Sequence, residues 1–195
     1  MSSEFVYLAS ASPRRRELLA QIGVIFRTID AGVDESLRAG EEAQAYVLRL
    51  ASEKAQCGFA RGGRGAPALG ADTSVVLDGR VLGKPADRDE GDSMLAALSG
   101  RTHTVLTAVA LCGAGGLRTA LSRTEVDFRP IAAEERGRYW DSGEPRDKAG
   151  GYAIQGYAAV FVSGLRGSYS GVVGLPLYET AALLAAAGVP CWVPA

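Results

Sequence analysis

The feature that most restricts the fold of this chain is an apolar run that stops at small hydroxyl residues and passes directly into a helical pattern. The run is Phe5–Ala9, FVYLA, and it precedes SASPRRRELL at 10–19. The β-branched and aromatic residues of the run favour a strand, and the leucines that follow the turn favour a helix. Ser12 suits the N-cap of that helix and Pro13 its first position. A strand, a turn and a helix are therefore expected at the start of the chain.

Three arginines, Arg14, Arg15 and Arg16, occupy the predicted first turn of this helix. Cations are unfavourable there because the helix dipole is positive at its N-terminus. Backbone N–H groups, the hydroxyls of Ser10 and Ser12, and guanidinium groups at one helix start together favour a phosphate site. The alternative is a solvated basic turn.

Further along, strands alternate with helices at first, and hairpins dominate the middle of the chain. Strands are predicted at 24–29, 68–77, 80–82, 102–111, 117–128, 158–162 and 189–193. Helices are predicted at 41–61, at 89–98, from Pro130 onward and at 177–187, and turns at 78–79, 114–116 and 167–171. This order predicts an α/β fold, a mixed twisted sheet with flanking helices. A chain of 195 residues is expected to form one domain, 1–195.

The charge balance excludes a general attraction to nucleic acid or membranes. The chain has 21 Lys+Arg and 22 Asp+Glu, a net charge of −1, so any anion binding must be local. Its three cysteines are too few and too far apart for a disulfide framework, which fits a reducing compartment. No secretion signal and no apolar stretch of ~18 residues are present. We therefore expect a cytoplasmic protein without a nucleic-acid or membrane partner.

Several charged residues fall inside apolar patterns. Asp72 interrupts a buried strand, where an ionised carboxylate needs a cation or hydrogen-bond donors, and such residues are often functional. Lys54 falls on the inward stripe of the helix at 41–61, either as a snorkelling side chain or as a ligand contact. Lys84 follows the 78–79 hairpin and is expected near Asp72. The pair Asp34-Glu35 suits a turn better than a cation site.

A second polar block, DKAGGYAIQG at 147–156, is suited to a loop that approaches a ligand closely. It contains Lys148 and Gln155. His103 is the only histidine, so His-pair catalysis is excluded, and we interpret it as a strand residue. The scattered cations suit a polyphosphate, while Asp72 with Glu35 suits a divalent ion or an attacking water.

Eight segments of the sequence, in order, resemble the Maf family of nucleoside-triphosphate pyrophosphatases. They are SASPRRRELL, VDE, SEKA, LGADT, LGKP, LSGRTH, DKAGGYAIQG and GSYSGVVGLPL, and the resemblance covers the chain from about Tyr7 to Gly188. The resemblance implies two lobes around a cleft, in a fold like that of inosine-triphosphate pyrophosphatases. It also implies hydrolysis of a nucleoside triphosphate to the monophosphate and pyrophosphate, with Mg²⁺ or Mn²⁺, and a homodimer.

The resemblance also implies roles for individual residues. Asp72 would accept the proton of the attacking water, and Arg14, Thr73 and Gln155 would set the base preference. Glu35, Lys54 and Lys84 match the family's remaining polar positions, as metal or phosphate ligands. The residue pattern itself adds Ser10, Ser12, Arg15 and Lys148 as expected substrate contacts and Asp72 as an expected metal ligand.

The segments Ala71-Asp72-Thr73 and Ile154-Gln155-Gly156 resemble the subgroup that acts on dTTP and UTP, with modified pyrimidine nucleotides as further candidates. The sister group that prefers 7-methyl-GTP is expected to have Ser-Asp-Gln and Ser-Glu-Gly instead. An amide offers both a donor and an acceptor to a pyrimidine edge, which a carboxylate does not. The alternative function is a non-catalytic nucleotide-binding regulator of cell division and septum formation.

Overall fold

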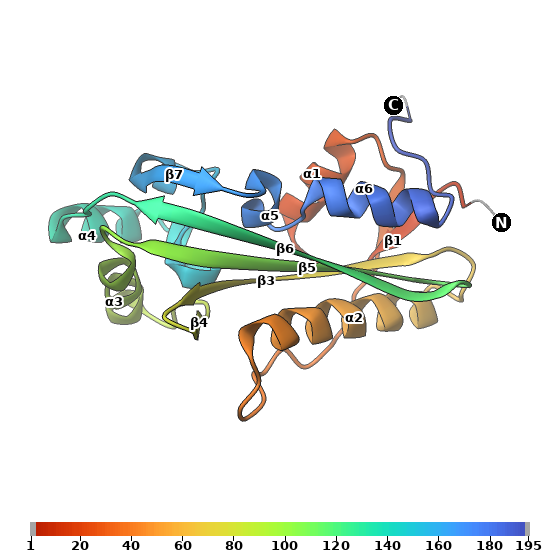
Figure 1. Cartoon of the computed structure of the whole chain (residues 1–195), viewed down its shortest axis with the longest axis horizontal. Helices are drawn as coiled ribbons and strands as arrows, with labels where there is room; N and C mark the ends of the chain where they lie inside the picture. The colour runs from red at the N-terminus through yellow and green to blue at the C-terminus, as the bar shows by residue number, and fades with distance from the viewer. Residues whose placement is uncertain (1–2, 194–195) are drawn as a thin grey trace. The chain divides into compact units, whose positions relative to one another are not determined.

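A computed structural model describes residues 3–193, and the chain divides into two compact units. Among the described residues, unit 1 comprises 3–72, 107–122 and 174–193, and unit 2 comprises 73–106 and 123–173. The sheet has seven strands in the order β2-β1-β3-β5-β6-β7, and β4 pairs with β3 (Figure 1). The sheet contains parallel and antiparallel strand pairs and is flanked by helices, which confirms the predicted α/β class.

The strands are β1 (Val6–Leu8), β2 (Phe26–Thr28), β3 (Ala68–Leu77), β4 (Arg80–Leu82), β5 (Thr102–Gly113), β6 (Gly116–Phe128) and β7 (Val162–Arg166). The α-helices are α1 (Pro13–Gln21), α2 (Ala43–Arg61), α3 (Arg88–Leu98), α4 (Ala133–Asp141), α5 (Tyr169–Val173) and α6 (Leu177–Ala186). Three 3₁₀ helices are η1 (Glu144–Asp147), η2 (Ala149–Gly151) and η3 (Tyr157–Phe161).

Unit 1 is built around parallel strands with helices on both faces. β1 pairs in parallel with β2, with Val6 opposite Phe26, and with β3, with Tyr7 opposite Ala68. The connection from β1 through α1 to β2 runs in one direction along the sheet, and the connection from β2 through α2 to β3 runs in the opposite direction. Right-handed connections therefore place the two helices on opposite faces. In Figure 1, α2 lies on one face of unit 1, and α1 and α6 lie on the other. The turn from β1 into α1 therefore stands at the carboxyl end of a parallel strand, where α/β proteins bind ligands.

Unit 2 is built from antiparallel pairs and packed 3₁₀ and α-helices. The predicted hairpin is confirmed: β3 and β4 are antiparallel, and Asp78 and Gly79 have positive φ values of 50° and 77°, as a type I′ turn requires. β7 pairs antiparallel with β6, with an irregularity between Asp127 and Phe128. The core of this unit contains a cluster of aromatic rings in edge-to-face contact, namely Phe128, Tyr139, Tyr152 and Phe161.

Several predicted elements are wrong or shifted. The strand predicted at 158–162 is the 3₁₀ helix η3, because the Glu144 carboxylate accepts hydrogen bonds from the amides of Tyr157 and Ala158 and turns the chain there. The helix predicted from Pro130 begins instead at Ala133. The Glu135 carboxylate accepts a hydrogen bond from the amide of the N-cap residue, Ala132.

The turn predicted at 167–171 continues into helix α5, whose start is capped by the Ser168 hydroxyl, an acceptor for the Gly171 amide (3.0 Å). The edge strand predicted at 189–193 is also wrong. The amides of Trp192 and Val193 donate to the carbonyls of Ile22 and Gly23, but this segment is not a strand. Hydrogen bonds from side chains to backbone amides thus outweigh the apolar pattern at η3 and at the start of α5.

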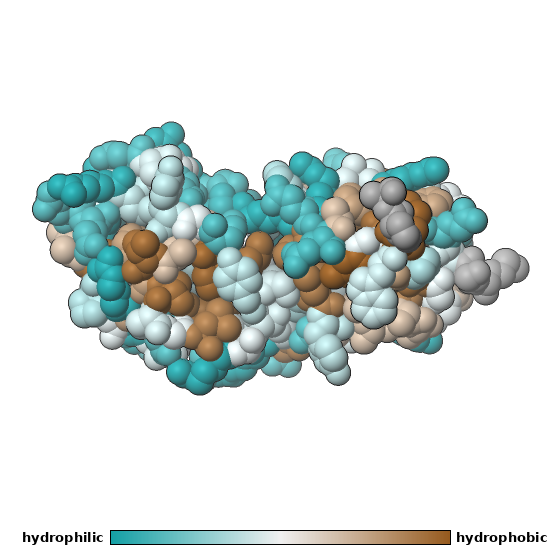
Figure 2. Space-filling model, turned by 90° about the horizontal axis from the view of Figure 1, so that it is seen from above, coloured by the Kyte–Doolittle hydropathy of each residue, from teal (hydrophilic) through white to brown (hydrophobic). Residues whose placement is uncertain are grey.

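Within residues 3–193, none of the helices combines the length and apolar character that a membrane crossing requires. Some large apolar side chains are nevertheless exposed, among them Tyr157, Val160 and Tyr169 of unit 2. On the face shown in Figure 2, hydrophobic residues, in brown, are interspersed with hydrophilic residues, in teal. Single exposed apolar residues are usual on a folded protein.

His103 is buried in the core of unit 2, as a strand residue of β5. Its Nε2 lies 2.8 Å from the Tyr152 hydroxyl, and its Nδ1 has no hydrogen-bond partner in residues 3–193. Burial lowers the pKa of His103 from 6.5 to about 4, against a smaller opposite effect of Asp127. The folded state thus holds the neutral ring, while the unfolded state takes up a proton below pH 6.5.

We therefore expect the stability contributed by neutral His103 to be lost as the pH falls from 6.5 to about 4, by ~3 kcal/mol in total. His103→Gln keeps a polar partner for Tyr152 without a titration. Its free energy of unfolding, measured by urea denaturation at several pH values, should fall less steeply across this range than that of the wild type. Parallel slopes for the two proteins would contradict the assignment.

Candidate functional site

The turn between β1 and α1 is held by hydrogen bonds among the predicted phosphate-binding residues. The Ser10 hydroxyl accepts from the Ser12 amide and from Arg15 Nη1, both at 3.2 Å, and Arg15 Nε donates to the Gly174 carbonyl (2.8 Å). Ser12 occupies the predicted N-cap, but its side chain makes no capping hydrogen bond. Burial lowers the pKa of Arg15, while the charges of Asp72 and Glu35 raise it. Arg15 therefore lies within electrostatic reach of both predicted carboxylates.

Close packing of α2 on β3 brings charged side chains of these two elements together. A Cβ on Gly70 would lie 2.3 Å from the Ala51 carbonyl oxygen and 2.5 Å from the Ala55 amide nitrogen, both in α2. The missing side chain lets the two backbones touch. Asp72 is two residues further along β3, so its side chain points to the same face as Gly70, toward α2.

Lys54 of α2 joins two carboxylates at this contact. Its Nζ lies 2.8 Å from Asp72 Oδ1 and 2.6 Å from Glu35 Oε1. The side chains of Lys54 and Asp72 are 8% and 11% exposed, whereas Glu35 is 53% exposed. The Lys54 ammonium therefore does not snorkel into solvent, and a contact between Lys54 and a ligand stays a prediction. The cluster thus consists of a buried carboxylate, a buried ammonium and an exposed carboxylate.

Burial and charge act on Asp72 in opposite directions. Burial raises the pKa of its carboxyl above the ordinary value, and Lys54 and Arg15 oppose that rise. Lys54 Nζ donates to Oδ1 at 2.8 Å. A carboxylate with one oxygen held in this way is suited to take a proton from a water molecule through the other oxygen.

Tyr46 holds Glu35 in place, although it was not predicted to be a site residue. The Tyr46 hydroxyl donates to the Glu35 carbonyl oxygen at 2.7 Å, and burial and the charges of Asp72 and Glu35 raise its pKa. Tyr46 precedes Lys54 by eight residues, two steps of i to i+4, so the two side chains lie on one helix stripe. This spacing is the sequence feature that could have indicated that Tyr46 lies near Lys54. The predicted turn is confirmed as well, since Asp34 Oδ1 accepts from the Ser36 amide (2.9 Å).

The donor set fits a hard divalent cation that is bound together with a substrate. In residues 3–193 no group of three or more His, Cys, Asp and Glu side chains is arranged to hold a metal ion. Mg²⁺ is commonly bound by one or two carboxylates, with phosphate oxygens and water completing its shell. Glu35 and Asp72 are two such carboxylates, already gathered around one cation, Lys54.

The other predicted site residues belong to unit 2. Thr73 follows Asp72 in β3, and Lys84 is exposed just after β4. Lys148 forms an ion pair with Asp147. The amide of Gly150 donates to the carbonyl of Gly83 (2.9 Å), so the segments that carry the two lysines are hydrogen-bonded to each other. Gln155 is exposed in the loop between η2 and η3.

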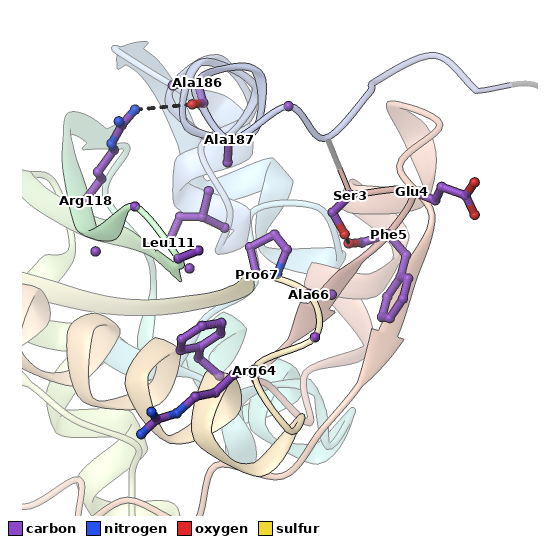
Figure 3. A pocket seen from close by; sticks show the side chains of 17 residues that line it. Ser3, Glu4, Phe5, Arg64, Ala66, Pro67, Leu111, Arg118, Ala186 and Ala187 are labelled. Carbon is purple, nitrogen blue, oxygen red and sulfur yellow. Dashed lines mark hydrogen bonds between the residues drawn. The ribbon is translucent and has the colours of Figure 1, made fainter. Parts of the chain in front are cut away.

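A pocket of about 760 Å³ elsewhere in unit 1 contains none of the predicted site residues. Its wall includes glycines of the β5–β6 turn, Arg64 and Arg118, and Arg118 donates to the Ala186 carbonyl at the end of α6 (3.4 Å; Figure 3). Among the described residues that line this pocket, Glu4 is the one acidic residue, and its side chain points away from the pocket in Figure 3.

The fold and the Asp72–Lys54–Glu35 cluster define an α/β protein with a buried acidic and cationic site. Residues 5–187 match the family model described as Maf-like protein. The chain therefore belongs to the Maf family.

Curated relatives resemble the chain over nearly its whole length. The dTTP/UTP pyrophosphatase of Saccharophagus degradans is 53% identical over 194 residues, which are 98% of this chain and 92% of the relative. That of Alkalilimnicola ehrlichii is 55% identical over 184 residues, 92% of this chain and 91% of the relative. Among solved structures, a nucleoside-triphosphatase (dITP/XTP pyrophosphatase) from Mycobacterium abscessus is 16% identical, with a TM-score of 0.46 over 93% of each chain.

Proposed function

We propose that this protein hydrolyses dTTP and UTP, and modified pyrimidine nucleotides of the same shape, to the nucleoside monophosphate and pyrophosphate. The observation that carries the proposal is the cluster in which Lys54 joins Asp72 and Glu35, with Arg15 beside it. Relatives at 53% and 55% identity that are named dTTP/UTP pyrophosphatase support the choice of substrate.

In this proposal Asp72 is the proton acceptor. Its Oδ2 takes a proton from the attacking water while Lys54 holds Oδ1. The water oxygen forms a bond to the α phosphorus, the phosphoanhydride bond between the α and β phosphates breaks, and pyrophosphate leaves. Stabilising the negative charge on the non-bridging oxygens is the main requirement of such a reaction. Arg14 and Arg15 at the start of α1 supply positive charge for this, with the hydroxyls of Ser10 and Ser12 as further donors.

A divalent cation, Mg²⁺ or Mn²⁺, would be held by Glu35 and Asp72 and would add Lewis-acid stabilisation of the phosphate oxygens. Lys84 is a proposed phosphate contact on the basis of the family resemblance, and Lys148 is proposed as a further phosphate contact because of its charge. Thr73 and Gln155, with Arg14, are proposed to set the preference for a pyrimidine base. The amide of Gln155 is suited to an edge that carries both a donor and an acceptor.

We also propose that the enzyme acts in the cytoplasm. Cys57, Cys112 and Cys191 are all free thiols, which is the usual state in a reducing compartment. The homodimer implied by the family resemblance stays a prediction.

A triphosphate panel tests the proposed function. With Mg²⁺ or Mn²⁺, we expect dTTP and UTP to give equal amounts of monophosphate and pyrophosphate, with kcat/KM at least about tenfold above that for purine triphosphates and 7-methyl-GTP. Product identification by ion-exchange chromatography separates pyrophosphate from inorganic phosphate. Faster hydrolysis of 7-methyl-GTP would contradict the base assignment. Tight binding of dTTP without any product would favour the non-catalytic regulator instead.

A further inference from the structure

The loop that carries Gln155 presents one polar side chain from a buried backbone. Tyr152, Ala153 and Ile154 are buried, at 4–6% exposure, and Ala158 after them is fully buried. Gln155 between them is exposed. An exposed amide on such a fixed loop is accessible to a ligand.

The carboxylate of Glu144 binds the backbone that directly follows this loop. Glu144 Oε2 accepts from the amide of Tyr157 (3.0 Å), and Oε1 accepts from the amide of Ala158 (3.3 Å). These are the first two amides of η3, which directly follows the loop. An acidic side chain that accepts from the amides of a helical turn satisfies its unpaired donors and fixes its direction.

Tyr139 of α4 extends this hold to the beginning of the loop. Its hydroxyl donates to Glu144 Oε1 (2.8 Å) and accepts from the Ala153 amide (3.2 Å). Burial, and then the hydrogen bond to Glu144, raises the pKa of Tyr139, so the hydroxyl keeps its proton and remains a donor. Amides on both sides of Gln155 are therefore connected to one carboxylate.

The Glu144 carboxylate lies close to the backbone of the loop. A Cβ on Gly156, the residue after Gln155, would lie 2.0 Å from Glu144 Oε2. A side chain at this position would therefore displace the carboxylate from the loop.

We propose that Glu144, together with Tyr139, is the positioning residue for base selection, because it fixes the loop from which Gln155 reads the pyrimidine edge. This inference rests on the proposed function, in which Gln155 contacts the base. Glu144 touches neither the base nor the phosphates in this proposal, and it acts only through the loop.

UTP and CTP provide a sharp test because they differ only at the base edge. We expect Glu144→Gln to lower the ratio of kcat/KM for UTP to that for CTP by about tenfold, the factor that one well-placed hydrogen bond controls. The glutamine amide would face N–H donors with an NH₂ group. Tyr139→Phe, which removes only one hydroxyl, should lower the ratio in the same direction. The kcat for UTP should change by less than about threefold in both variants.

Asp92→Asn is the matched control. It weakens another acidic hydrogen-bond network of unit 2, in which Asp92 accepts from Arg136 at 2.8 Å, and it should leave the UTP to CTP ratio unchanged. Hydrogen exchange measured by mass spectrometry should show faster exchange at residues 153–158 in Glu144→Gln and not in Asp92→Asn.

The outcomes separate the two levels of the proposal. If the wild type prefers UTP and the Glu144 and Tyr139 variants keep that preference, the positioning role is wrong while the proposed function stands. If activity falls equally with UTP and CTP, Glu144 has only a structural role. A wild type without base preference overturns the assignment of Gln155 and this inference together.

Discussion

Asp72→Asn is expected to fold normally and to lose turnover of dTTP by ~100-fold or more, the scale associated with the loss of a catalytic base. The asparagine oxygen can still accept the hydrogen bond that Lys54 donates to Asp72 Oδ1, at 2.8 Å in the wild type. The ammonium also keeps its pair with Glu35. The fold thus loses little, whereas the side chain can no longer take a proton from water.

Turnover should be measured as pyrophosphate release at saturating dTTP, with circular dichroism and urea denaturation to establish folding. Asp30→Asn is the matched control. Asp30 is an exposed aspartate of the same unit that accepts a hydrogen bond from the Gly32 amide, and its substitution should leave turnover within about twofold. Turnover near the wild-type value in folded Asp72→Asn would remove Asp72 from the reaction.

Lys54→Met is expected to destabilise the protein by ~3 kcal/mol, because removing one partner of a buried ion pair leaves an uncompensated charge. The methionine fills much of the same space, but Asp72 loses the ammonium beside its Oδ1. Arg15 compensates in part, since it also acts on the pKa of Asp72. The free energy of unfolding from urea denaturation at pH 7 is the measurement.

A double variant and a surface control identify the cause of this loss. Lys54→Met combined with Asp72→Asn has no unpaired buried carboxylate, so most of the lost stability should return. Arg138→Met removes an ion pair with Glu134 in which both side chains are more than three-quarters exposed, and it should change stability little. A double variant no more stable than Lys54→Met would assign the loss to packing instead of charge.

Much of the fold was predictable because its strongest sequence patterns are local. The Asp78-Gly79 turn and the strand before it appear in the structure with the predicted bounds. The segment after Gly156 was not predictable. Its apolar residues suit a strand, and only the Glu144 carboxylate, twelve residues earlier than Gly156, turns it into a 3₁₀ helix. A contact with a distant side chain leaves no periodic trace in the segment itself.

The residues of the site likewise divide into those that the sequence could predict and those that only the structure could reveal. Asp72 was identifiable because a charged residue inside a buried strand demands a partner, and Lys54 because it lies on an inward helix stripe. Their pairing, 18 positions apart in the chain, needed the structure. The roles of Thr73 and Gln155 came from the family resemblance alone, since no spacing or hydrophobic pattern marks them. Tyr46 and Tyr139 act through single hydroxyl groups, which sequence patterns do not distinguish from core aromatic residues.

Gly70 has a consequence for attempts to make this enzyme more heat-resistant. Exchanging a strand glycine for a bulkier residue is a common engineering step, since it restricts the unfolded chain. At this position even a methyl group would strike the backbone of α2 at 2.3 Å and would force apart the two surfaces that carry Asp72 and Lys54. Sequence design that favours rigidity should therefore leave this glycine untouched and seek its gains in the loops.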